Sequence, residues 1–295
     1  MHIRLVECLD KPHADDDREA LAAALRAKGF DAEWVAWDDP AVDWQGGMSI
    51  LRATWNYYRS PETYRAFLAW ADSCEQRAPL FNPAATVRWN SHKGYLKDLE
   101  ARGLPIVPTL LCRRDETYDS FEAAIGARGW RELVIKPAVS AGSFQARRFR
   151  IDEGGGEEAE AHWRTLLEGG DVLIQPFVRS VASRGEHSWV WIDGELTHAV
   201  RKNVRFHGEK EQVEMLTSPP EDEAALAEQV FAPWKGHLLY GRLDLVRDEN
   251  DAPCIMELEL IEPSLFLAEA GHALDALITA IGHRIQASVA PTATR

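Results

Sequence analysis

The chain has 295 residues, of which 45% are hydrophobic, so it can bury a full core and form two or three sub-domains. A formal net charge of −14 argues against nucleic-acid binding, because phosphate backbones are held by clustered Lys and Arg. The four cysteines form no CxxC pair, the N-terminus lacks the pattern of a signal peptide, and no apolar run is long enough to span a membrane. These features predict a cytoplasmic protein with reduced thiols that binds neither nucleic acid nor membranes.

The first part of the chain alternates strand-like and helix-like segments. Asp16 and Glu19 are spaced as a capping box for the first helix, and Gly29 is placed to end it. Ser60 and Pro61 mark the start of the second helix. We expect strands at residues 3–8, 32–37, 48–54 and 79–82, and helices at 15–29 and 60–77. The alternation predicts an open α/β sheet with ligands at the carboxyl ends of its strands, where the stretch LRATWNYY lies.

The rest of the chain is richer in strands. Asp193-Gly194 joins two alternating runs and is the strongest hairpin signal in the sequence. The acidic stretch 152–160 is expected to be a solvated surface turn. We expect further strands at 106–112, 131–137, 144–151 and 171–178, and helices at 91–102, 118–129, 221–234 and from about residue 265 onward.

Two short segments near the C-terminus, RLDL and MELEL, carry charge at every second position. The turn between them predicts an antiparallel hairpin in which Asp244 lies opposite Glu257 and Arg242 lies opposite Glu259. These four residues then share one face, which we call the charged face. The opposite face is apolar and packs, so the charged face is a candidate functional site.

Three carboxylates this close repel one another, by roughly 1 kcal/mol per pair in water at about 4 Å and about 4 kcal/mol at an effective dielectric of 20. A bound cation would remove this repulsion. Oxygen ligands without His or Cys favour magnesium (Mg²⁺), with Mn²⁺ as an alternative, and magnesium usually shares its shell with phosphates. Two other interpretations stay open: a solvent-facing sheet with cross-strand salt bridges, and a carboxylate pair for glycoside hydrolysis.

The sequence carries neither of the two common phosphate-binding motifs, GxxxxGK[ST] and a GxGxxG after a strand. Lys136 ends an apolar strand and is followed by small residues at 138–143, whose backbone N–H groups can approach phosphate oxygens. Lys93 lies in the first turn of a helix. Each lysine alone also fits a structural or surface role.

The order of six motifs resembles the ATP-grasp superfamily, in its glutathione-synthetase-like and ribosomal-protein-modifying branch. The motifs are the Lys93 helix, LVIKPAVSAGS, LIQPFV, GEHSWVWIDGEL, RLDL and MELELIEPS. The resemblance implies an ATP-grasp fold, mixed α/β and α+β, with four parts: an N-terminal Rossmann-like (pre-ATP-grasp) substrate domain at 1–88, a lid subdomain with a central helix at 89–175, a C-terminal subdomain with the metal site at 176–288, and a tail at 289–295.

The resemblance also implies roles for single residues around ATP and Mg²⁺. Arg242 would steady an acyl phosphate, and the metal ligands would be Asp244, Glu257 and Glu259. The residues that would contact ATP are Lys93, Lys136, Ala141, Gly142, Ser143, Gln175, Phe177, Val178 and Glu186. Two of these positions depart from the family, which commonly has Asn in place of Glu259 and often Glu in place of Gln175.

The residues that bind the substrate are predicted from where they lie along the predicted strands. Arg201 and Lys202 end the strong hairpin and could reach phosphate or substrate, although a surface role fits them equally. Arg52 could hold a substrate carboxylate with two hydrogen bonds. The predicted substrate residues are Arg52, Trp55, Asn56, Tyr57 and Ser264.

The resemblance implies an ATP-dependent carboxylate–amine ligase that acts on a small amino-acid-like substrate through an acyl phosphate. LRATWNYY and VRWNSHKGYL are also similar to a small-molecule subgroup that includes the D-cycloserine-forming cyclo-ligase. The alternatives are such an intramolecular cyclo-ligase, a kinase-like phosphotransferase, and a nucleotide-binding module without turnover. Family members are often dimers, which leaves a homodimer open.

Overall fold

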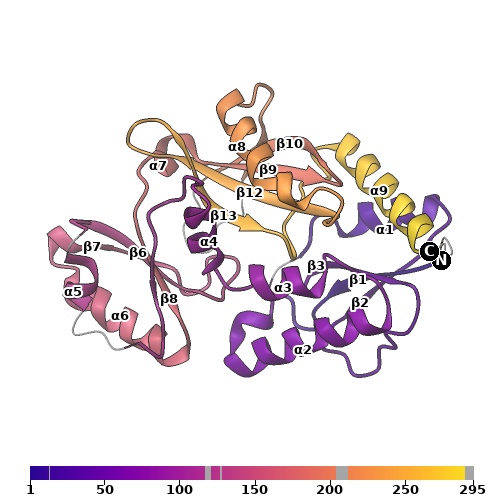
Figure 1. The fold of residues 1–295 in the computed structure, drawn as a ribbon, viewed down its shortest axis with the longest axis horizontal. Helices are drawn as coiled ribbons and strands as arrows, with labels where there is room; N and C mark the ends of the chain where they lie inside the picture. The colour runs from indigo at the N-terminus through magenta and orange to yellow at the C-terminus, as the bar shows by residue number, and fades with distance from the viewer. Residues whose placement is uncertain (13, 117–120, 127, 204–211, 290–295) are drawn as a thin grey trace.

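The computed structural model describes residues 1–12, 14–116, 121–126, 128–203 and 212–289. Three sheets follow one another along the chain, and Figure 1 shows the N-terminal sheet and the second sheet at opposite ends of the molecule, with the third between them. The predicted tail beyond residue 289 lies outside the described residues. No helix in the described ranges is both long and apolar enough to cross a membrane.

The N-terminal sheet is parallel and has the strand order β2-β1-β3-β4, which confirms the predicted α/β unit. Its strands are β1 (His2–Glu7), β2 (Asp31–Ala36), β3 (Met48–Ala53) and β4 (Leu80–Phe81), and its helices are α1 (Arg18–Ala27) and α2 (Pro61–Arg77). Ser60 caps α2 as predicted, because its side chain accepts a hydrogen bond from the backbone N–H of Thr63. The predicted capping box of α1 is wrong: Asp17 is the N-cap, and its side chain makes no cap bond.

The second sheet is antiparallel, with the order β5-β8-β6-β7. Its elements are β5 (Leu110–Cys112), α5 (Phe121–Gly126), β6 (Glu132–Pro137), β7 (Arg147–Arg150), α6 (Gly156–Gly169) and β8 (Val172–Pro176). The acidic stretch predicted as a turn is wrong in its second half, because α6 begins at Gly156 and buries Ala159, Trp163 and Leu166. Parts of the predicted 118–129 helix, residues 118–120 and 127, lie outside the described residues.

The third sheet carries the charged face and has the order β11-β10-β9-β12-β13. Its elements are β9 (Glu186–Ile192), β10 (Glu195–Lys202), β11 (Val213–Met215), α8 (Glu221–Phe231), β12 (Tyr240–Arg247) and β13 (Pro253–Glu259). The predicted hairpin is confirmed, since Arg242 pairs with Glu259 and Asp244 pairs with Glu257. The C-terminal helix α9 (Gly271–Val289) begins six residues later than expected, because residues 263–268 form a loop.

Side chains from the linking segment cover the outer edge of β13. Helices α3 (Ala84–Asn90) and α4 (Tyr95–Ala101) lie in this segment, and α7 (Ser180–Arg184) precedes β9. The Asn82 amide donates to the carbonyls of Tyr240 and Leu260 at 2.8 and 2.7 Å, and accepts from the N–H of Leu239 at 2.7 Å. Asn90 likewise accepts from Leu260 N–H at 2.7 Å. These bonds join the N-terminal unit to the strands of the charged face.

Candidate active site

The charged face is organised around the guanidinium of Arg242. This guanidinium donates two hydrogen bonds of 2.9 Å to the carboxylate of Asp244 and one of 2.6 Å to Glu259. It also donates to the carbonyl of Ser264 at 3.1 Å. Because Arg242 and Asp244 are two residues apart on β12, they point to the same side of the sheet. One cation therefore holds carboxylates on two neighbouring strands.

Strands β9 and β10 add a lysine and a third carboxylate, that of Glu186. The Lys202 ammonium lies 2.9 Å from Asp244 and also pairs with Glu186. Ser188 donates to Asp244 at 2.5 Å. Gly185, which precedes Glu186, has φ of 75°, and a Cβ there would lie 2.5 Å from the carbonyl oxygen of Lys202. Glycine therefore allows the close approach that brings Glu186 to Lys202.

Lys93 connects the charged face with the loop after β6. Its ammonium pairs with Glu257 and donates to the carbonyl of Ser140 at 2.9 Å, and its backbone N–H donates to the carbonyl of Ala138 at 2.7 Å. The structure thus brings Lys93, Lys202 and Arg242 together with four carboxylates. Arg201 is not in this cluster, because it points to the other side of β10 and pairs with Glu214 at 2.6 Å.

The pKa values reflect competition between burial and these ion pairs. Burial raises the pKa of a carboxyl group, but Arg242 and Lys202 outweigh it at Asp244 and hold its pKa below the usual value. Lys93 and Lys136 have the same effect on the pKa of Glu257. At Glu259 burial dominates, together with the neighbouring carboxylates, and raises the pKa to about 7. Burial also lowers the pKa of Lys136.

The donor chemistry fits magnesium, but the carboxylates are held by cations of the chain itself. Asp244, Glu257 and Glu259 offer only oxygen atoms, as Mg²⁺ and Mn²⁺ prefer. In the described part of the chain, no group of three His, Cys, Asp or Glu side chains is arranged to hold a metal ion as it stands. Lys93 and Arg242 occupy the positions between these carboxylates. Metal binding would therefore require these side chains to give up their ion pairs.

Most of the predicted nucleotide residues lie on the second sheet or in the segments that follow β6 and β8. Gly142 and Ser143, after β6, have φ of 57° and 59°, in the left-handed region. The Gln175 amide is buried and donates to Thr109 Oγ1 at 2.9 Å. The Arg148 guanidinium lies 3.6 Å from the ring centroid of Phe177. Val178 is partly buried and packs against a small hydrophobic cluster near β13. Ala141 lies in the same turn as Gly142.

Arg52 is fully buried rather than open to a ligand. Its guanidinium lies 3.5 Å from the Asp17 carboxylate and 3.9 Å from that of Asp15, and donates to the carbonyl of Pro263 at 3.2 Å. A substrate carboxylate would have to compete with these two acids. Asp15 and Asp17 were not identified from the sequence, where they read as helix-start residues.

Two of the other predicted substrate residues, Trp55 and Tyr57, contact Glu262. Trp55 donates to the backbone carbonyl of Glu262 at 3.0 Å, and the hydroxyl of Tyr57 bonds to its carboxyl group. Burial raises the pKa of Glu262 to about 8. Asn56 points elsewhere, accepting from Trp37 Nε1 at 2.8 Å and donating to Asp38 at 2.7 Å. Glu262, which follows β13, is a site residue that the sequence reading missed.

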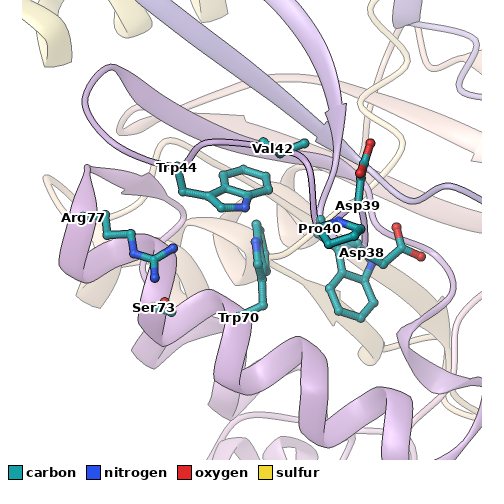
Figure 2. Close-up of a pocket in the computed structure, with 9 residues that line it drawn as sticks. Asp38, Asp39, Pro40, Val42, Trp44, Trp70, Ser73 and Arg77 are labelled. Carbon is teal, nitrogen blue, oxygen red and sulfur yellow. The ribbon is translucent and has the colours of Figure 1, made fainter.

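A cavity of about 320 Å³ lies beside the N-terminal sheet and away from the charged face (Figure 2). Figure 2 shows Trp44 and Trp70 facing each other between Arg77 and the Asp38–Pro40 stretch. Asn56 links the cavity to the predicted substrate residues, because it hydrogen-bonds Trp37 and Asp38. Its residues are Trp37, Asp38, Asp39, Pro40, Val42, Trp44, Trp70, Ser73 and Arg77.

Known proteins similar to this chain point to one family. Residues 3–82 match the family described as D-cycloserine synthetase DcsG, N-terminal domain. The cycloserine biosynthesis protein DcsG of Streptomyces lavendulae is 32% identical over 269 residues, which cover 86% of this chain and 88% of that protein. The crystal structure of D-cycloserine synthetase DcsG gives a TM-score of 0.85 at 30% identity and covers 96% of this chain and 99% of that chain. A D-alanine–D-alanine ligase from Bacillus anthracis complexed with ATP shares the fold, with a TM-score of 0.66 at 14% identity over 96% of each chain.

The fold and these similarities define an ATP-grasp ligase of the class that forms carbon–nitrogen bonds. The fold and enzyme class expected from the order of the six motifs are confirmed. Within this class, the chain belongs to the family of D-cycloserine synthetase DcsG.

Proposed function

We propose that this chain is an ATP- and Mg²⁺-dependent ligase that joins a carboxylate to a nitrogen of the same small, amino-acid-like molecule. D-cycloserine is the product that the name of its relative suggests. The observation that carries the proposal is the charged face, where Arg242, Lys202 and Lys93 alternate with carboxylates, in a chain that aligns with DcsG over nearly its full length.

The proposed reaction has two steps. A substrate carboxylate oxygen attacks the γ-phosphorus of ATP, the bond to ADP breaks, and an acyl phosphate forms. The nitrogen then attacks the acyl carbon; the carbon–nitrogen bond forms, the bond to phosphate breaks, and the nitrogen loses a proton. The second step closes a ring when the nitrogen belongs to the same molecule, and joins two molecules when it does not.

The chain's own residues supply position and charge rather than a covalent nucleophile. Arg242 would neutralise the acyl phosphate, and Lys202 would keep Asp244 ionised. Lys93 and Lys136 would hold phosphates of ATP, with Ala141, Gly142 and Ser143 above them. Asp244, Glu257 and Glu259 would hold magnesium, which when bound would supply positive charge to offset the negative charge that develops on the phosphates.

Replacing Glu257 by Gln tests the metal assignment. Gln keeps the size of the side chain but lacks the charge that would bind Mg²⁺, so turnover should fall at least about 100-fold. Calorimetry with a non-hydrolysable ATP analogue, with and without Mg²⁺, should show magnesium-dependent binding that the variant loses. The exposed Glu249→Gln, on the turn of the same hairpin, is the control. A fully active Glu257→Gln enzyme would exclude this residue as a metal ligand.

Product analysis separates the candidate reactions. We would incubate the protein with ATP, Mg²⁺ and acyclic derivatives of D-serine whose hydroxyl oxygen carries a free or acylated nitrogen. ADP release together with D-cycloserine from the free-nitrogen substrate, or with its N-acylated form from the acylated substrate, supports ring closure. ADP with a product joining two molecules would indicate intermolecular ligation, and a stable phosphorylated product would indicate a kinase. No ADP release with any substrate would contradict the proposed function.

A further inference from the structure

The loop at residues 263–268, after β13, forms one side of the position that Arg242 occupies. The carbonyl of Ser264 accepts a hydrogen bond from the Arg242 guanidinium at 3.1 Å. The guanidinium carbon lies 5.6 Å from the ring centroid of Phe266, within the range of a cation–π contact. Asp244 and Glu259 hold the guanidinium from the strands. The orientation of Arg242 therefore depends on the loop as well as on the sheet.

The backbone of this loop is held in an unfavourable conformation. Phe266 has φ of 51°, in the left-handed region, although its side chain is bulky and 6% exposed. A residue of this kind costs on the order of 1–3 kcal/mol and persists only where the surroundings impose it. The surroundings of Phe266 must therefore include groups that hold the loop.

Asp17, from the N-terminal unit, holds the loop by its backbone. One carboxylate oxygen accepts hydrogen bonds from the N–H groups of Leu267 and Ala268, at 2.8 and 3.3 Å, and the other accepts from Leu265 N–H at 3.3 Å. Asp17 is 3% exposed, so these bonds form away from water. Arg52 lies 3.5 Å from the same carboxylate and donates to the carbonyl of Pro263. Bonds to an ionised acceptor are about twice as strong as neutral ones.

We propose that Asp17 is a positioning residue for the ligase reaction. By holding the 263–268 loop, it fixes the carbonyl of Ser264 and the ring of Phe266, and through them the guanidinium of Arg242. The inference rests on the proposed function, in which Arg242 neutralises the acyl phosphate. It assigns to the N-terminal unit a direct part in arranging the charged face.

The variant Asp17→Asn tests this role with a small change. Its amide oxygen can still accept from Leu267 and Ala268, but its NH₂ group cannot accept from Leu265. We expect kcat to fall about tenfold or more while the KM for ATP stays within about twofold, because the interaction with Arg242 matters most when charge develops. The kcat of Asp17→Ala should fall further than that of Asp17→Asn. Asp16→Asn makes the same charge change at the exposed neighbouring residue and should match wild type.

A second variant, Phe266→Asn, removes the aromatic ring but keeps a residue that can adopt the left-handed backbone conformation. Asn tolerates the left-handed region, so a loss of kcat is not due to backbone strain. Phe266 also packs in the hydrophobic core, so only a loss of kcat in fully folded protein reports the missing contact with Arg242. It should show the same lowered kcat with an unchanged KM for ATP. Calorimetry with Mg²⁺ and the ATP analogue, which counts binding sites per protein, shows how much of each variant is folded.

The outcomes separate the inference from the proposed function. Lowered kcat in both variants, with wild-type ATP-analogue affinity and full binding stoichiometry, supports the role of Asp17. Wild-type kcat in Asp17→Asn and Asp17→Ala, or a loss of kcat that matches a loss of binding stoichiometry, overturns it. If wild-type protein itself shows no substrate-dependent ADP release, the proposed function fails, and the inference that rests on it fails too.

Discussion

Single residues on the charged face show how the chain neutralises its own acidic groups. The repulsion among Asp244, Glu257 and Glu259 suggested a metal ion, but the structure pairs them with Arg242, Lys202 and Lys93. The repulsion alone therefore does not require a metal. At Asp244 and Glu257 the cations outweigh the effect of burial and lower the carboxyl pKa, whereas the pKa of Glu259 stays raised. The metal assignment rests on the oxygen donors and on the family, and Glu257→Gln tests it.

A buried histidine gives a prediction for the effect of pH on stability. Burial, with the nearby ring of His272, lowers the pKa of His198 to about 4 from an ordinary value of 6.5. The unfolded chain then binds more protons than the folded one below pH 6.5. Stability should be unaffected by His198 above that pH and fall as the pH drops toward 4, by roughly 3 kcal/mol in total.

Urea unfolding at pH 7.5 and 5.5 measures this contribution. The His198 ring forms a hydrogen bond of 3.0 Å with the Leu265 carbonyl. In His198→Gln, the amide can still donate to this carbonyl, but it does not titrate. The free energy of unfolding should therefore drop by about 1 kcal/mol less in His198→Gln than in wild type. His283→Gln, at an exposed position of α9, should behave as wild type. Equal drops in wild type and His198→Gln would show that His198 is not held neutral.

At the scale of elements, the loop between β6 and β7 rests on the N-terminal unit. The rings of Phe144 and Tyr58 lie 4.8 Å apart between centroids, and Val139 packs against the N-terminal core. The 138–143 loop is the predicted cover of the ATP phosphates. Its position therefore depends on an aromatic contact with the N-terminal unit.

Removing this contact should weaken ATP binding. An aromatic pair contributes about 0.5–1.5 kcal/mol beyond its buried area, so Phe144→Ala should raise the KM for ATP about two- to tenfold. Tyr58→Phe keeps both rings and should leave the KM near the wild-type value. Steady-state ADP release with varied ATP provides the measurement. An unchanged KM in Phe144→Ala would mean that the loop does not need Tyr58 to hold ATP.

At the scale of the whole molecule, the N-terminal unit and the strands of the charged face are joined by polar side chains. Asn82 bonds Tyr240 of β12 and Leu260 after β13, Asn90 bonds Leu258 and Leu260, and the Tyr95 hydroxyl accepts from Leu258 N–H at 3.0 Å. An uncovered edge strand is open to pairing with other chains. These side chains both satisfy backbone groups at this edge and fix the charged face relative to the predicted substrate residues.

Asn82→Ala should therefore destabilise the protein strongly. It leaves the N–H of Leu239 and the carbonyls of Tyr240 and Leu260 without these bonds, and Asn82 is fully buried. Buried unsatisfied groups cost about 1–3 kcal/mol each, so we expect a loss of roughly 3 kcal/mol in urea unfolding. Asn250→Ala, on the exposed hairpin turn, should stay within about 0.5 kcal/mol of wild type. Similar stability of the two variants would contradict the joining role of Asn82.

The sequence by itself determined the features that depend on local pattern. The turn between RLDL and MELEL predicted the register of β12 and β13, Asp193-Gly194 predicted the β9–β10 hairpin, and Ser60 predicted the start of α2. Each depends on residues close together in the chain or on the two-residue period of a strand. The order of the six motifs was enough to predict the fold and the enzyme class.

Only the tertiary structure decided which partners the charged groups take. It placed Lys202 in the cluster and Arg201 on the opposite side, buried Arg52 against Asp17, and bonded the Asp17 carboxylate to the backbone of residues 265–268. These partners lie up to 250 residues apart in the sequence. Local pattern carries no information on such contacts, because burial and long-range charge pairing exist only once the three sheets have come together.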